Sequence, residues 1–194
     1  MPTVATPNIM QDPGFIYLAP TGTAFPTGVS TASKFSDAPS VTLVEVGATE
    51  DGTKFKYAPS IEAVTVAEFL DPVLWRTVSR EGSMAFNLAD FTLNNLKRAM
   101  NGGTISTVGG SGATLVSEYI PPVLGAEVRL ALMWESQDST MRIFFYKTIN
   151  VADVEAAFQK APSYAVYPCE FRMEVDASGN TFKVQTAGTA RLGV

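Results

Sequence analysis

The amino-acid sequence predicts a mainly β fold, either a β-sandwich or a partly open barrel, with one flanking amphipathic α-helix and long loops. Three observations support this prediction. Apolar residues recur at every second position in several short runs, which is the period of a strand with one buried face. Clusters of Gly, Ser, Thr, Asn and Pro separate these runs. Only one segment has apolar residues at helical spacing, and the sequence contains no internal repeat or heptad.

The chain has 194 residues, which fits one domain by the usual length of roughly 100–200 residues. A chain of this size buries roughly 70% of its unfolded surface, enough for a core without disulfides. Residues 1–13 are polar and contain several prolines. We therefore expect a single domain over residues 1–194 that begins with an arm at about residues 1–13.

Strand patterns in the first part of the chain are separated by a long loop. Phe15–Leu18 is a short β-prone run that stops at Pro20. Residues 21–40 are rich in Gly, Ser, Thr and Pro and have no period, so we expect a loop there. Val41–Val46 is again β-prone, and Thr53–Tyr57 alternates with lysines, which predicts a half-buried strand.

The next segment contains turn and strand-breaking signals. Asp51–Gly52 is a hairpin signal between the two preceding runs. Ile61–Glu68 continues as a strand, whereas residues 67–80 contain Asp71–Pro72. Because proline removes a donor from a central ladder, we expect residues 67–80 to form an edge, a bend or a projecting loop.

One amphipathic helix is predicted after the alternating run that ends at Leu88. Asp90 is a suitable N-cap, and Asn101–Gly103 is a strong stop signal. Leu93, Leu96 and Met100 lie at helical spacing, so we expect this stripe to cover a sheet.

Alternating strands dominate the second half. A Gly-rich loop at about residues 102–112 precedes them, and residues 151–160 have the character of a short helical turn. The alternating runs are Val128–Trp134, Arg142–Ile149, Cys169–Val175 and Phe182–Val184.

The composition favours assembly over catalysis. Charged residues make up 17% of the chain, against roughly 25% in an average domain. A surface with few charges is easily desolvated, as a protein–protein interface requires. The chain has no histidine, which excludes Ser–His–Asp catalysis, a histidine general base and His-ligated zinc. We expect no catalytic residues, no cofactor and no metal.

The remaining composition bears on partners and compartment. The net charge is −5 and the longest basic run is Lys97–Arg98, so a basic patch that binds DNA is not expected. The single cysteine, Cys169, alternates with apolar residues and predicts a buried, inert thiol. No apolar run reaches the roughly 20 residues of a membrane helix, and the N-terminus lacks a secretory signal pattern. We expect a soluble protein of a reducing cytoplasm with no membrane partner.

Several ordered features resemble the major tail tube protein of long, non-contractile-tailed bacteriophages (siphophages). They are the Val-Gly-Ala-Thr start of a hairpin at Val46–Thr49, a long loop between strands, and a strand that leads directly into the helix over Phe86–Met100. An aromatic-Pro-x-Glu-Phe strand at Tyr167–Phe171 is followed by the turn Gly179–Asn180. The similarity extends over Val41–Val184 and lies in order and character, without an invariant motif.

The resemblance implies a structural virion protein of the tail, made in the host cytoplasm. Six copies would form a ring, their sheets would join into a barrel around a bore, and rings would stack into an open tube. The arm and the loops at 21–40, 67–80 and 102–112 would contact other copies. Implied partners are further copies, the tape measure protein in the lumen, the tail terminator, distal tail or baseplate proteins, and genomic DNA that passes without specific binding.

Two sets of site residues follow from this reading. An acidic bore repels phosphate, so DNA slides through it. The candidate lumen acids are Glu45, Glu50, Asp51, Glu62, Glu170, Glu174 and Asp176. For any one of these acids an ordinary solvated or paired surface charge is the more frequent case, so we expect only a subset to line the bore. The candidate inter-subunit contacts are Phe69, Leu70, Trp75, Phe25 and Phe35.

Three other interpretations remain open. A carbohydrate-binding β-sandwich module would expose aromatics such as Tyr17, Tyr57, Trp75 and Tyr119 on one face. A carboxylate hydrolase needs two acids across a cleft, and no motif pairs any two acids here. The tube of a contractile tail or type VI secretion system is the nearest structural alternative.

Overall fold

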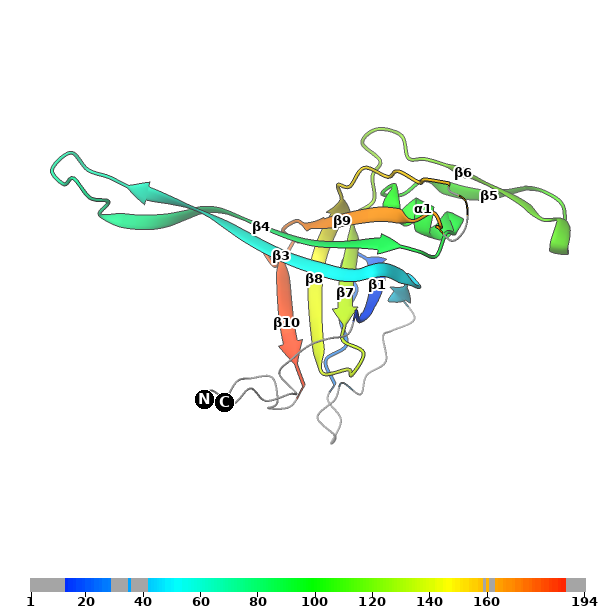
Figure 1. The fold of residues 1–194 in the computed structure, drawn as a ribbon, viewed down its shortest axis with the longest axis horizontal. Coiled ribbons are helices and arrows are strands. Elements are labelled where there is room, and N and C mark those ends of the chain that lie inside the picture. The colour runs from blue at the N-terminus through cyan, green and yellow to red at the C-terminus, as the bar shows by residue number, and fades with distance from the viewer. Residues whose placement is uncertain (1–12, 29–34, 36–41, 159, 161–162, 188–194) are drawn as a thin grey trace.

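The computed structural model of the chain describes residues 13–28, 35, 42–158, 160 and 163–187 (Figure 1). These residues form a mainly β, sandwich-like fold, as predicted. The strands are β1 (Phe15–Pro20), β2 (Val44–Glu45), β3 (Thr49–Val64), β4 (Leu74–Leu88), β5 (Thr104–Gly109), β6 (Val116–Ile120), β7 (Leu130–Glu135), β8 (Met141–Asn150), β9 (Tyr167–Met173) and β10 (Phe182–Thr186). The helix α1 spans Leu93–Ala99, and a 3-10 turn spans Gly112–Thr114.

The main sheet folds into two layers that share strand β8. Its strand order is β2-β1-β7-β8-β9-β4-β3, with every neighbouring pair antiparallel, and β10 also pairs with β8. One edge of β8 pairs with β7. The other pairs with β10 over Met141–Phe145 and with β9 over Thr148–Asn150. Figure 1 shows β1, β7, β8 and β10 running across the direction of β3, β4 and β9.

The core lies between these two layers. Its buried residues come from both of them and from the segment before β3: Ile16, Leu18, Val46, Met84, Phe86, Leu88, Leu132, Trp134, Ile143, Phe145, Tyr167, Cys169 and Phe171, with Ala99 of the helix. The Phe86 and Phe171 rings stack with centroids 5.7 Å apart. Each fully buried aliphatic or aromatic side chain contributes about 1.5–3 kcal/mol, so burial of this cluster is a large favourable term in folding.

The Asp51–Gly52 sequence forms a bulge in place of the predicted hairpin turn. Strand β3 runs continuously through it, and its register with β4 shifts between Glu50 and Thr53. Asp51 has a φ of 58° and Gly52 a φ of 75°, the left-handed conformation that Asp and Gly tolerate. The same residues that favour a tight turn therefore insert one kink into a long strand.

Helix α1 forms where it was predicted, but its cap differs. The cap is Thr92, whose hydroxyl accepts a hydrogen bond from the Asn95 N–H at 3.2 Å. Asp90 precedes this cap, and its carbonyl accepts from the Asn95 amide at 2.9 Å.

The predicted apolar stripe of the helix is also wrong. Leu93 and Met100 are exposed, and only Leu96 packs on the core. The buried helix residues are Asn95 and Ala99. Asn95 lies inside because its amide donates to the Val46 carbonyl at 2.8 Å, a tertiary bond that spacing does not indicate.

The predicted loops differ from the structure in extent. Residues 1–12 of the arm lie outside the described residues, as does most of the 21–40 loop. Residues 74–80, expected in a loop, belong to β4, and residues 104–109 form β5. Residues 151–158 contain no helical turn.

The interlayer core gives a first prediction. Phe171→Ala removes a buried ring and should lower the free energy of unfolding by about 3–5 kcal/mol, measured by urea denaturation. Phe158→Ala is the matched control, because that ring is 80% exposed and its loss should change stability by about 0.5 kcal/mol or less. Equal losses in the two variants would contradict the placement of the core.

Candidate assembly surface

Strands β3 and β4 continue beyond the two layers as a long two-stranded ribbon (Figure 1). At its base, Tyr57 packs against Phe182 of β10 with ring centroids 5.6 Å apart. Beyond that contact, every residue from 59 to 81 is exposed. We call residues 59–81 the ribbon. It has no packing partner among the described residues, so only the ladder between its own strands holds it.

The ribbon is apolar although it is exposed. Trp75 is 67% exposed and Leu70 is completely exposed. The other exposed apolar residues of the ribbon are Ile61, Val64, Val66, Phe69, Val73, Leu74 and Val78. If a free aromatic side chain offers about 150–250 Å² and an aliphatic one somewhat less, these residues expose roughly 900 Å². Apolar patches larger than a few hundred Å² on a soluble domain mark an interaction site.

The two faces of the ribbon differ in charge. Residues directly opposite in the register share a face, so Ala63 and Trp75 lie together with Ile61 and Thr77 on one face. Glu62 lies opposite Arg76 on the other face. The face that carries Trp75 is thus uncharged over this stretch, while the opposite face presents an acid and a base side by side.

The five predicted contact residues separate into two groups. Phe69, Leu70 and Trp75 all lie exposed on the ribbon. Phe25 packs on Phe144, with centroids 4.6 Å apart. Phe35 is buried, and the Arg142 guanidinium lies 4.2 Å from its ring centroid. Both thus cover the chain's own sheet, which the Gly/Ser/Pro-rich sequence around them does not reveal.

A buried ion pair lies beneath Phe35. The Nε of Arg142 on β8 donates to Oε2 of Glu135 on β7 at 2.9 Å, and both side chains are almost fully buried. Arg142 also donates to the Pro26 carbonyl at 3.3 Å. Removing one member of such a pair leaves a buried charge, which is strongly destabilising. The pair therefore attaches the segment after β1 to the outer face of β7 and β8.

The seven candidate lumen acids do not share one face. Glu45 lies on β2, Glu62 lies on the ribbon, and Asp176 lies in the turn before β10. Glu170 on β9 pairs with Arg172 at 3.2 Å. Backbone N–H donors, Asn180 first, hold the pKa of Asp176 below its ordinary value.

Glu174 is in an ion-pair cluster. Its carboxylate lies 2.9 Å from Nζ of Lys147 and 3.5 Å from Nε of Arg129. Burial acts to raise the pKa of Glu174, but hydrogen bonds and the charges of these two bases outweigh it and lower the pKa. The negative charge of Glu174 is therefore neutralised by Lys147 and Arg129 of the same chain.

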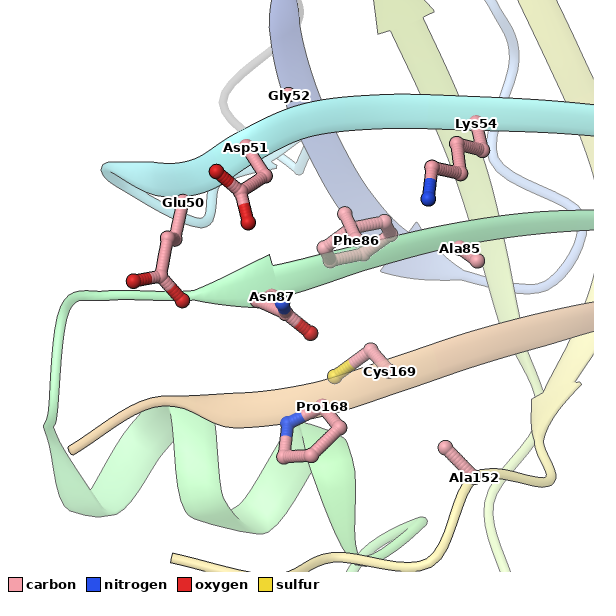
Figure 2. A pocket seen from close by; sticks show the side chains of 10 residues that line it. All are labelled: Glu50, Asp51, Gly52, Lys54, Ala85, Phe86, Asn87, Ala152, Pro168 and Cys169. Atoms are coloured by element: carbon pink, nitrogen blue, oxygen red, sulfur yellow. The ribbon is translucent and has the colours of Figure 1, made fainter. Parts of the chain in front are cut away.

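Glu50 and Asp51 line a cavity of about 250 Å³ between β3, β4 and β9. Figure 2 shows their carboxylates at one end of this cavity and the Lys54 side chain at the other. The Cys169 side chain contributes to its wall. The charged residues that line the cavity are these two acids and one base.

A second projecting hairpin was not predicted. Strands β5 and β6 form a separate two-stranded sheet, anchored by the Tyr119 hydroxyl, which donates to the Gly102 carbonyl at 2.8 Å. With the loop that follows, it spans residues 104–125, which we call the distal hairpin. Its exposed apolar residues are Val108, Leu115, Val116, Ile120, Val123 and Leu124. The β-branched runs on either side of Gly109–Gly112 are the sequence signal for this hairpin.

Figure 1 shows the ribbon and the distal hairpin extending from opposite sides of the layered body. Of the four aromatics of the carbohydrate-binding alternative, Tyr57 and Trp75 are exposed, whereas Tyr17 is half-buried on β1 and Tyr119 is half-buried on β6 in the separate two-stranded sheet.

Within the described residues, no cluster of three or more potential metal ligands occurs. No helix in that part of the chain has the length and apolar character needed to cross a membrane. No protein-family model matches the chain, and no curated protein is significantly similar to it.

The buried ion pair gives a second prediction. Arg142→Met leaves Glu135 buried and unpaired, and should lower the free energy of unfolding by about 3–5 kcal/mol in urea denaturation. The double variant Glu135→Leu/Arg142→Met should recover most of that loss. Arg129→Met, at a half-exposed ion pair, is the control and should cost less than about 1 kcal/mol. A double variant as unstable as the single one would contradict this account.

The buried thiol gives a third prediction. Burial raises the pKa of Cys169 to about 12, so at pH 8 the thiol is protonated as well as shielded. Its reaction with Ellman's reagent should be slow in the native protein and should rise with the unfolded fraction in urea. The control, Cys169→Ala/Ser60→Cys, places the thiol on the exposed ribbon and should react at once. Rapid native labelling of Cys169 would show that the β4–β9 region opens.

Proposed function

We propose that the protein is a structural subunit of a bacteriophage tail tube, which assembles with copies of itself into stacked hexameric rings around a bore for DNA. The observation that carries the proposal is the ribbon, an exposed apolar extension of roughly 900 Å² on an otherwise layered β domain. A standard protein–protein interface buries about 800 Å² per partner, so a contact that covers both faces of the ribbon reaches that size.

Composition and sequence order support the same conclusion. The chain is poor in charge, and a surface of that kind is desolvated at little cost when copies associate. The resemblance to siphophage tail tube proteins supplies the ring, the tail of the virion as the location, and the partners: tape measure, tail terminator, distal tail or baseplate proteins, and passing DNA. The net charge of −5 per copy suits a bore that does not bind phosphate.

A ribbon variant tests the proposal. Leu70→Ser/Trp75→Ser replaces two exposed apolar residues and should leave the fold and thermal midpoint unchanged while it abolishes assembly. The measurement is negative-stain electron microscopy with light scattering across a concentration series. The wild type should form stacked rings with a central hole.

Phe158→Ser/Val175→Ser is the matched control, since both residues are exposed and lie outside the ribbon. It should assemble like the wild type. A wild type that stays monomeric across the series would contradict self-assembly of the isolated chain. Normal tubes from the ribbon variant would remove the observation on which the proposal rests.

A further inference from the structure

We infer that the ribbon of one copy docks on the distal hairpin of the next, so that the contact joins two different surfaces of the same chain. The inference rests on the proposed self-assembly and adds to it the partner surface that receives the ribbon. Both surfaces are apolar, both extend away from the core, and they lie on opposite sides of the body (Figure 1).

The areas of the two surfaces reach the size of a specific contact only in combination. By the side-chain areas used for the ribbon, the six exposed apolar residues of the distal hairpin present roughly 600 Å². The roughly 900 Å² of the ribbon is divided between its two faces, since Ile61 and Trp75 lie on one face and Val64 and Leu74 on the other. One face of the ribbon and the hairpin together therefore bury roughly 1,000 Å², the lower limit for a specific interface.

The charges of the two surfaces also match. Over residues 104–125 the only charged residue is Glu118, and its carboxylate accepts a hydrogen bond from the Ser106 hydroxyl at 3.2 Å. The ribbon face with Ala63 and Trp75 is uncharged over the paired stretch. An uncharged strand face can be buried against an uncharged hairpin without leaving an unpaired ion.

The alternative contact between two ribbons is less complete. A twofold pairing would cover the ribbon of each copy but would leave both distal hairpins exposed. Docking of ribbon on hairpin covers both surfaces with a single kind of contact. Because donor and acceptor lie on opposite sides of the body, such a contact is heterologous and can repeat from copy to copy.

A complementation experiment tests this assignment. One variant, Leu70→Ser/Trp75→Ser, has a defective ribbon surface and an intact distal hairpin. The other, Val116→Ser/Leu124→Ser, has a defective hairpin surface and an intact ribbon. All four substituted residues are exposed. By analytical ultracentrifugation, each variant alone should stay a monomer. An equal mixture should form a dimer and nothing larger, because one intact ribbon and one intact hairpin leave a single productive contact.

Each result decides the inference. A hairpin variant that polymerises like the wild type overturns the acceptor role but leaves self-assembly standing. A hairpin variant that doubles its mass by itself shows ribbon-to-ribbon pairing and overturns the inference too, as does a mixture that does not change in mass. A wild type that never assembles overturns the proposed function and this inference together. Phe158→Ser/Val175→Ser should polymerise normally, which shows that serine substitutions on exposed sites do not block assembly in general.

Discussion

The architecture depends on the sharing of β8 between two layers. Along one edge β8 pairs with β7 alone, while the other edge changes partner from β10 to β9 between Phe145 and Thr148. This change turns the chain from one layer into the next and encloses Phe145 between them. The change of partner also sets the direction of the second layer, because β9 pairs with β4 and β4 pairs with β3. The ribbon continues along those two strands.

The exposed ribbon is a direct result of that arrangement. Strand β9 pairs with β4 over Ser83–Leu88, so within the described part of the chain the remainder of β4 has only β3 as a neighbour. A two-stranded ribbon has no interior, and its apolar residues therefore face solvent on both sides until another surface covers them. The same sequence period that builds the core near Met84 places Trp75 and Ile61 outside it. The proposed function follows from the length by which β3 and β4 extend beyond the residues that pair with β9.

Local patterns in the sequence predict the strands well and their partners poorly. The alternation in β9 matches its burial, because that strand has one buried and one less buried face. Strand β7 has the same alternating sequence but is buried on both faces, and β10 has no fully buried residue. The inward face of α1 was missed because Asn95 satisfies carbonyls of distant segments, which no spacing rule contains. Asp51–Gly52 was misread because a bulge and a turn require the same left-handed residues. The packing of half-buried Phe25 and buried Phe35 depends on Phe144 and Arg142, more than a hundred residues later in the chain.

The position of β1 determines when the core can close during synthesis. Strand β1 lies inside the sheet between β2 and β7, and Phe15 pairs opposite Glu135. Strand β7, its main partner, thus leaves the ribosome about 120 residues after β1. At about 5–20 residues per second, this is a delay of roughly ten seconds. The β3–β4 hairpin needs only local contacts and forms within that interval. On a polysome, neighbouring nascent chains therefore expose the apolar residues of their ribbons before any of them has a finished body, which leaves an interval of seconds in which they can associate prematurely.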